Sequence, residues 1–518
     1  MIMNSRSLRT LRGTVLTYGL VLMTVIAIIF FGLIRFVVSN IQLSLRAEPS
    51  AQALQIAEAG VYFYRWHLAH NVEGRTATQI ADFWENSPLA VDDDGDGDCD
   101  DEDSEGSGDD DDADTLESYT VDYSDGTQDV GQYRICVLPP SQYSTIVTIT
   151  STGWSNNRPN IQHTVTARLR KPSWSEYAIL SNEFMRLSEG TEIFGTIHVN
   201  KGFHFDGVAH NVVTSSVDEY YDNDSDVDGI RPAVWAADLD DENSNGDTSD
   251  PDPDDSDHFL AGKEFPVRVI DFDSATADFN VMRATALSGG GNVYFDTSQY
   301  GRYIEFGEPT STEMRVRTVN DYDGVYSSDD HNFNIYALGP AEIYSIPVEG
   351  VVYVEDNVWI EGTVPAGYNV TVAAHDPRSS ASRSIYLGTG DLKYASSEDE
   401  NVEESILGLA AEENVQIIRY IKGDTSSNSS ETLHVDGALL AQKGYIGWQR
   451  VTGPTWTNVI QGITINGAIV SNKRLGFGYT SGAGFTNRDL IFDTELLFQP
   501  PSLFPAGDSY AIDLWESQ

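Results

Sequence analysis

The chain has 518 residues, with 80 acidic against 31 basic side chains and a formal net charge of −49 at pH 7. This length exceeds one ordinary hydrophobic core, so two or three folded units are expected. The acidic charge excludes a nucleic-acid-binding surface, which needs the opposite sign. The two cysteines, Cys99 and Cys136, exclude a disulfide framework. They allow one disulfide outside the cytoplasm, and the sequence leaves open whether the two residues meet.

The N-terminus combines a basic leader with an apolar run. Three arginines (Arg6, Arg9 and Arg12) precede Gly13, and residues 15–34 carry no charge. About twenty apolar residues are enough for a helix that crosses a bilayer. Because positive charges concentrate before the run, we expect a single-pass membrane protein with a cytoplasmic N-terminus and an extracytoplasmic body.

After Pro49 the helix pattern continues with small residues, and residues 53–60 read Ala-Leu-Gln-Ile-Ala-Glu-Ala-Gly. This stretch strongly resembles the helix of PilX-type minor pilins and related pseudopilins. The resemblance implies that a prepilin peptidase cuts between Gly13 and Thr14, after which the protein joins other pilin subunits. Most major pilins carry glutamate at the fifth mature position, where this chain has Tyr18. Its absence suits a subunit at the filament tip, and it equally suits a signal-anchored protein that never enters a filament.

The next part predicts a small antiparallel domain. Four strands are expected, at residues 119–123, 132–138, 144–151 and 163–170, with turns at residues 125–126, Gly153 and residues 156–157. The predicted organisation is a leader (1–13), a transmembrane and pilin-like helix region (14–90), an acidic insertion (91–115), this β domain (116–172) and a strand-rich body (173–518).

The body shows recurring strand patterns. The sequence Leu-His-Val-Asp-Gly-Ala-Leu-Leu at residues 433–440 is echoed by Ile-Thr-Ile-Asn-Gly-Ala-Ile-Val at residues 463–470, and more briefly by residues 197–200. Such echoes favour a β-helix or solenoid in which strands stack, with a β-sandwich as the alternative. One helix is expected at residues 274–287, and the tail from residue 500 to residue 515 is expected to pack back as a closing strand. The predicted fold class is therefore mainly β with a long N-terminal helix.

Two acidic stretches match calcium loops. Residues 92–114 and 218–258 hold 15 and 16 of the acidic side chains. Within them, oxygen-bearing residues recur at the spacing of an EF-hand loop, with glycine at the sixth position. Aspartate replaces glutamate at position twelve, which weakens binding, and the alternative is a solvated acidic insertion. The predicted ligands of the first loop are Asp92, Asp94, Asp96, Asp98, Asp100 and Asp103; those of the second are Asp241, Asn243, Asn245, Asp247, Ser249 and Asp252; a partial third loop has Asp224, Asp226 and Asp228.

A histidine-rich stretch follows the first body strands. Strand alternation places Phe203 and Phe205 inside and leaves His198, His204 and Asp206 outside. Polar residues on a solvated rung account for this pattern better than a transition-metal site that also uses Asn200 and His210.

These features predict a non-enzymatic minor pilin-like protein of a type IV pilus. It would be incorporated in the filament or at its tip and would display an adhesive β-rich body stabilised by calcium, with an unknown protein or glycan as surface ligand. Two alternatives stay open. One is a signal-anchored β-helical polysaccharide lyase or hydrolase, for which acids are plentiful but basic residues are sparse. The other is a static envelope scaffold.

Overall fold

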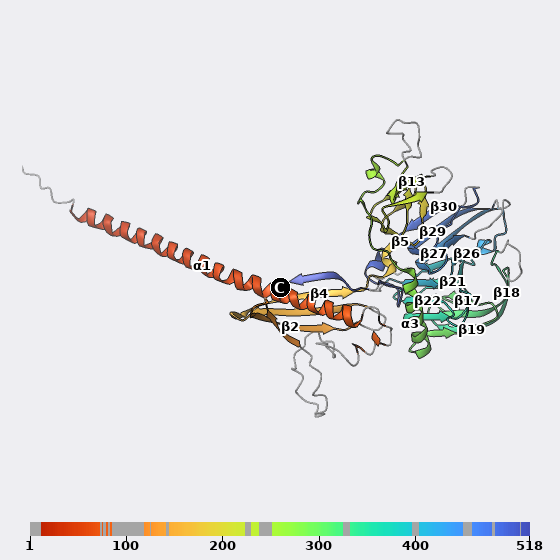
Figure 1. The fold of residues 1–518 in the computed structure, drawn as a ribbon, viewed down its shortest axis with the longest axis horizontal. Helices are drawn as coiled ribbons and strands as arrows, with labels where there is room; N and C mark the ends of the chain where they lie inside the picture. Colours follow the sequence, from red (N-terminus) through yellow and green to blue (C-terminus); the bar gives the residue numbers. More distant parts are fainter. Residues whose placement is uncertain are drawn as a thin grey trace, which may run out of the picture.

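The computed structural model has three parts: a long helix, a small antiparallel sheet against its C-terminal half, and a large strand-rich body (Figure 1). The first two form one end of the molecule, and the body forms the other. The structure describes residues 12–72, 75, 79–80, 83–84, 119–124, 126–140, 145–222, 229–237, 251–324, 332–395, 404–448, 458–478, 482–507 and 509–517.

The small sheet is antiparallel, with strand order β1-β2-β3-β4-β31. The expected strands are confirmed, and the turn at residues 156–157 joins β3 to β4. Gly153, predicted in a turn, lies instead inside β3. The elements of this part are helix α1 (Arg12–Asn71), β1 (Tyr119–Ser124), β2 (Asp129–Leu138), β3 (Val147–Ser155), β4 (Arg158–Arg170) and β31 (Ala511–Ser517).

The closing strand of the sheet comes from the far end of the chain. Strand β31 pairs antiparallel with β4, and Ala511 lies opposite Arg170. The tail is therefore a closing strand, as expected, but it completes the small sheet rather than the body to which we assigned it. The body, from Pro172 to about Tyr510, is inserted between two neighbouring strands of the small sheet (Figure 1).

The body is built mainly from parallel strands, as a stacked coil requires and a β-sandwich does not. Its longest run pairs β16-β20-β22-β25-β27-β29-β5-β8-β11-β15, every pair parallel. These strands are β16 (Val293–Phe295), β20 (Glu349–Val354), β22 (Asn369–Ala374), β25 (Ile406–Ala411), β27 (Asn428–Ala441), β29 (Val459–Ser471), β5 (Tyr177–Ser181), β8 (Thr196–Val199), β11 (Val213–Ser215) and β15 (Lys263–Glu264).

Two further parallel runs form the other sides of the coil. One pairs β17-β21-β23-β26-β28, and the other pairs β21-β24-β27-β29-β30. Their strands are β17 (Arg302–Phe306), β21 (Val358–Val364), β23 (Ile385–Leu387), β24 (Leu392–Tyr394), β26 (Val415–Ile417), β28 (Ile446–Trp448) and β30 (Gly484–Ile491).

The remaining described strands are peripheral. Strands β18 and β19 form an antiparallel hairpin beside β17, β6-β9-β14 and β7-β10 are short parallel groups, and β12-β13 is a short antiparallel pair. Their bounds are β6 (Met185–Leu187), β7 (Glu192–Ile193), β9 (Phe203–Phe205), β10 (Val208–Ala209), β12 (Glu219–Asp222), β13 (Gly229–Pro232), β14 (Val234–Trp235), β18 (Glu313–Tyr322) and β19 (Ile335–Ser345).

The two stretches that echo each other in the sequence, residues 433–440 and 463–470, pair residue by residue in the structure. Leu433 of β27 lies opposite Ile463 of β29, Gly437 lies opposite Gly467, and Leu440 lies opposite Val470. A Cβ atom on Gly467, whose φ is +157°, would collide with the Gly437 backbone. The shared glycine therefore permits the close approach of two successive strands.

Both faces of the longest run are buried. Side chains such as Val372, Leu409 and Leu439 fill the interior of the coil. The opposite face carries small residues such as Ala373 and Ala410, and it packs against helix α3 (Ala275–Ser288). The helix confirms the prediction for residues 274–287, with Gly289 as its C-terminal cap.

A row of stacked polar side chains marks the corner where these strands end. Asn200 Nδ2 donates to Asn182 Oδ1 at 2.8 Å, Asn182 Nδ2 donates to Asn472 Oδ1 at 3.0 Å, and Asn472 Nδ2 donates to the Gln442 carbonyl at 2.6 Å. Each residue follows the last position of its strand. The row satisfies buried amides that would otherwise destabilise the turns.

Candidate functional site

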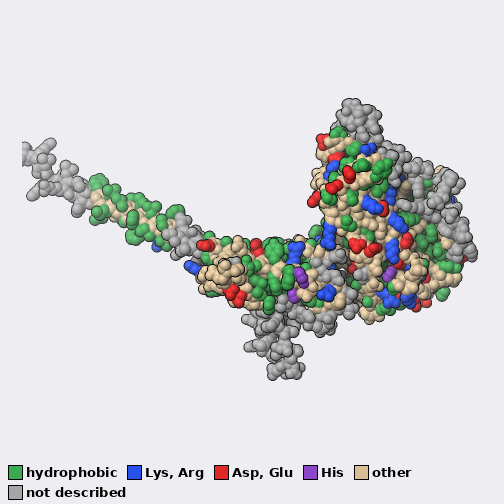
Figure 2. Space-filling model, in the orientation of Figure 1, with side chains coloured by type: hydrophobic (Ala, Val, Ile, Leu, Met, Phe, Trp, Pro, Cys, Tyr) green, Lys and Arg blue, Asp and Glu red, His purple; other side chains and the backbone are tan. Residues whose placement is uncertain are grey.

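The first half of helix α1 is an exposed apolar surface. Thr17–Ser39 is 23 residues long with a mean hydropathy of 2.7, and none of it is buried in the protein. Figure 2 shows this hydrophobic segment projecting from the molecule. By length and composition the segment is able to span a bilayer as a single-pass anchor.

The second half of helix α1 packs on the small sheet. Ala53, Ile56, Ala57 and Leu68 are fully buried there. Small residues are needed because the helix and β3 approach closely. An added Cβ on Gly153 would lie 2.6 Å from the Ala53 carbonyl oxygen and would collide with the Ala57 nitrogen. The Ala- and Gly-rich pattern of the helix thus has a packing role in this structure.

The predicted cleavage point lies at the start of the described chain. Gly13 and Thr14 belong to the first turn of helix α1, and residues 1–11 lie outside the described residues. Tyr18, at the position where glutamate is usual, is 76% exposed. Cleavage between Gly13 and Thr14 stays a prediction.

The predicted calcium loops fall almost entirely outside the described residues. This holds for Asp92, Asp94, Asp96, Asp98, Asp100, Asp103, Asp224, Asp226, Asp228, Asp241, Asn243, Asn245, Asp247 and Ser249. Of the second loop, Asp252 is described, and the Asp252 amide donates to the Ala236 carbonyl at 2.9 Å. A bridge between Ala237 and Pro251 brings the two ends of that insertion together.

Asp252 lies beside two other residues of metal-ligand type, Asp257 and His258, with one ligand atom of each within 4.8 Å of the others. His258 Nδ1 is 2.8 Å from the Gly207 carbonyl, so it carries the proton, and Nε2 faces Asp252 Oδ2 and Asp257 Oδ1, each at 3.9 Å. This group is compatible with a cation at the end of the second loop. Calcium itself stays a prediction.

The histidine-rich stretch is buried, which corrects the expectation of a solvated rung. His198, His204 and Asp206 are 2%, 0% and 8% exposed. His204 Nε2 bonds Asp206 Oδ1 at 2.8 Å, and its ring stacks on Trp235 at 3.8 Å. Burial raises the pKa of Asp206, but the bonds from His204 and from the Ala237 amide outweigh it and lower the pKa overall.

The other two histidines are held separately. His198 contacts Thr214 Oγ1 at 2.8 Å and Asn200 Oδ1 at 3.0 Å, and burial lowers its pKa, which favours the neutral ring. His210 stacks on Phe194 at 4.0 Å. Among the described residues, no metal-ligand group forms from these histidines.

Of the predicted disulfide pair, Cys136 lies on β2 in the small sheet, and Cys99 lies outside the described residues. Cys136 is disulfide-bonded, which supports the predicted pair, since Cys99 is the other cysteine of the sequence.

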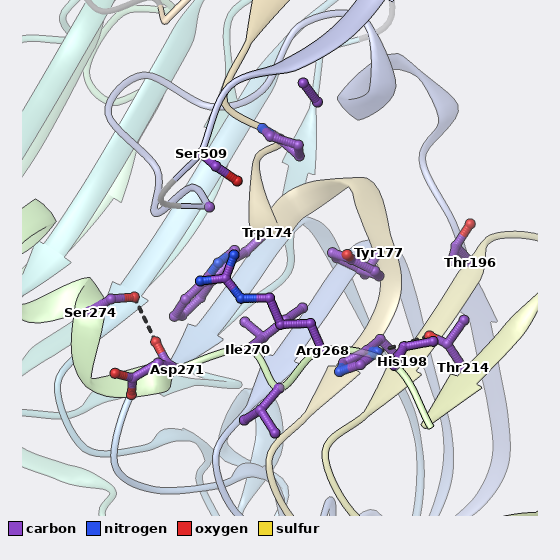
Figure 3. A pocket seen from close by; sticks show the side chains of 15 residues that line it. Trp174, Tyr177, Thr196, His198, Thr214, Arg268, Ile270, Asp271, Ser274 and Ser509 are labelled. Atoms are coloured by element: carbon purple, nitrogen blue, oxygen red, sulfur yellow. Dashed lines mark hydrogen bonds between the residues drawn. The ribbon is translucent and has the colours of Figure 1, made fainter. Parts of the chain in front are cut away.

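A pocket of about 440 Å³ lies where the small sheet meets the body (Figure 3). Five separate stretches line it. Two of them are the chain crossings, which are the segments that connect the small sheet to the body (residues 172–177, running into β5, and residues 507–511, running into β31). The others are β8, β11 and the segment before α3. Its volume lies in the range of small-molecule sites. The lining residues are Pro172, Trp174, Tyr177, Thr196, His198, Thr214, Val267, Arg268, Val269, Ile270, Asp271, Ser274, Gly507, Ser509 and Ala511.

The pocket combines an apolar wall with a few polar groups. Trp174 is nearly buried against Phe272, with ring centroids 5.1 Å apart, and burial raises the pKa of the Tyr177 hydroxyl. Figure 3 shows Arg268 between Asp271 and Ser274 on one side and Thr214 on the other. Local sequence patterns do not reveal this site, because its residues lie in five stretches that only the fold brings together.

No protein-family model matches the chain, and no curated protein matches it. Among solved structures, the competence-associated pilin ComZ from Thermus thermophilus aligns over 91% of this chain and 97% of its own, at 13% identity and a TM-score of 0.23. That TM-score is too low to assign a fold or a function to this chain.

Proposed function

We propose that the protein is a membrane-anchored, pilin-like subunit that carries a β-rich body on the outer side of the membrane. The observation behind this proposal is that one helix serves two environments. Residues 18–38 of helix α1 are exposed and apolar, whereas the helix from Ala53 to Leu68 is packed on the small sheet.

Such a helix needs a partner outside its own chain. An apolar surface of this length is unfavourable in water, and lipid or the helices of other subunits are able to cover it. The basic leader before Gly13 and the Ala- and Gly-rich pattern that resembles PilX-type minor pilins both support a subunit that moves from the membrane into a filament. Within this proposal, in which the subunit enters a filament, Tyr18 in place of glutamate suits a position at the tip.

The position of the body suits a domain that is displayed away from the membrane. It is inserted between β4 and β31 at the end of the small sheet away from the membrane segment (Figure 1). In this proposal it binds a surface ligand without catalysis, and calcium in the acidic insertions stiffens its loops. Extracellular calcium is high enough to fill weak loops of this kind.

The first test is the N-terminus of the protein recovered from its own cells. Intact mass and N-terminal sequencing are expected to show a chain that begins at Thr14. A Gly13→Leu variant should keep residues 1–13 and stay in the membrane, whereas a Gly19→Ala control should be processed normally. A wild-type chain that keeps residues 1–13 would overturn the filament part of the proposal and leave a static anchored scaffold or a tethered enzyme.

A further inference from the structure

The pocket at the junction of sheet and body contains polar groups that make no hydrogen bond to any described side chain or backbone group. In the described part of the chain, the Arg268 guanidinium has no hydrogen bond or ion pair, and neither the Tyr177 nor the Thr196 hydroxyl has a hydrogen-bond partner. Ser509 adds another such hydroxyl from the chain crossing near β31. These groups come from both the body and the crossing, and they line one cavity (Figure 3).

The neighbouring polar groups are already satisfied and serve as the rigid wall. His198 is held between Thr214 and Asn200, and Asn200 also accepts from the Ile270 amide at 3.0 Å. These bonds fix β8, β11 and the segment before α3 against one another. The site is therefore preformed, which lowers the entropy cost of binding.

The charges of the lining select the ligand class. Among the described residues of the lining, Arg268 is the one cation and Asp271 is the one carboxylate. A guanidinium recognises a planar carboxylate through two parallel hydrogen bonds. A single cation in a chain of net charge −49 disfavours phosphates and other multivalent anions.

We propose that this pocket binds an acidic sugar, a pyranose ring with one carboxylate. The carboxylate pairs with Arg268, the ring hydroxyls bond Tyr177, Thr196 and Asp271, and the C–H face of the ring lies on the apolar wall. The cavity of about 440 Å³ accommodates such a ring with its substituents.

The test uses the full chain in nanodiscs of zwitterionic lipid, with D-galacturonate as probe and D-galactose as its uncharged counterpart. Titration followed by saturation-transfer NMR is expected to show saturable binding of galacturonate and binding of galactose at least about tenfold weaker, because a hydrogen bond to a charged group is lost. Arg268→Gln should weaken galacturonate binding about tenfold or more, and Arg268→Lys should restore part of it.

Two further variants keep the result decisive. Thr196→Tyr fills the cavity and should abolish binding of both sugars. Arg158→Gln, at the exposed first position of β4, should change nothing. Three results would overturn the proposal: equal binding of the two sugars, an equal loss of binding in Arg268→Gln and Arg158→Gln, or no saturable signal up to about 20 mM. This inference does not rest on filament assembly, since an uncut leader leaves the pocket unchanged and failed binding leaves leader processing unchanged.

Discussion

The two halves of helix α1 share one backbone conformation and have opposite surroundings. The first half exposes large side chains such as Phe30 and Phe31, at 63% and 70%. The second half buries small ones, Ala53 and Ala57, against the glycine of β3. Small side chains let a helix and a strand of the same chain approach closely, whereas large exposed ones require lipid or another molecule. The residue sizes along one helix thus separate its internal contacts from its external ones.

The largest expected effect comes from placing a charge in the exposed half. Ile28→Lys adds an ammonium near the middle of the membrane segment, at a cost of about 2.5–3.5 kcal/mol for insertion. We expect a lower membrane-bound fraction in flotation experiments and an unchanged unfolding midpoint of the soluble parts. Gln55→Lys, at an exposed position of the second half, should leave membrane binding intact. Equal membrane binding of both variants would contradict the assignment of the first half.

A loss of stability with unchanged membrane binding is expected where the second half of the helix meets the sheet. Gly153→Ala forces a methyl group against the helix backbone and should cost about 1–3 kcal/mol of unfolding free energy. Denaturant titration in detergent measures this loss, and membrane binding should not change. Gly476→Ala, where an added Cβ has nothing within 4 Å, is the control and should be neutral. A neutral Gly153→Ala would show that the close approach is not required.

A smaller effect is expected where the sheet connects to the body. Asp513 accepts from Arg168 Nε at 3.0 Å and from Arg170 Nε at 2.7 Å. Asp513→Asn should therefore cost about 1 kcal/mol near neutral pH in denaturant titrations, and Asp129→Asn should cost nothing.

The Asp513 effect should depend on pH. Burial raises the pKa of Asp513, but its bonds to the two arginines lower the pKa overall. The stabilisation is thus present above the unfolded-state pKa and is lost as pH falls through the lower folded-state value. A difference between Asp513→Asn and wild type that persists at pH 2 would refute this account.

A pH-dependent effect of the opposite sign is expected in the body, and it leaves the helix unaffected. Burial, together with the neighbouring Glu404, raises the pKa of Asp493 to about 6. The ionised carboxylate therefore destabilises the fold above pH 6, and this penalty fades as pH falls toward the unfolded value near 4. Asp493→Asn keeps an acceptor for the Glu495 amide and should raise the melting temperature at pH 8 but not at pH 4.

Asp424→Asn is the control, because it should change the melting temperature in the opposite direction. Its pKa is lowered by hydrogen bonds from Ser426 and Ser429. Asp424→Asn should therefore lower the melting temperature slightly at pH 8, and the difference should disappear in acid. If both variants shifted in the same direction, the pKa differences would not explain the pH dependence of the body.

Much of the fold could be predicted because its signals are local. The charge-free run at residues 15–34 predicts the apolar helix, and alternation predicts strands β1 to β4. The echo between residues 433–440 and 463–470 predicts stacked strands, and the structure adds that the two stretches pair in register, with Gly437 opposite Gly467. The small residues near Gly60 were assigned through a resemblance, and their packing on β3 is a physical reason that the sequence alone did not provide.

Other features could not be predicted because they depend on distant partners. Alternation assigned His204 to the outer face of its strand, but Trp235 of the adjacent strand covers that face. The tail was expected as a closing strand, and nothing local indicates that its partner is β4. The junction pocket joins Tyr177 to Ser509 across most of the body's sequence, so no spacing of residues predicts it.

The insertion of the body between β4 and β31 determines how the molecule carries mechanical tension. The two chain crossings leave the small sheet at the same end, where Arg170 lies opposite Ala511. A pull on the body is therefore divided between two covalent connections, and it does not slide β4 against β31. The force instead shears β4 along β3, whose long register loads many hydrogen bonds at once. The body therefore stays covalently attached to the stem, and the small sheet should unfold only at high force.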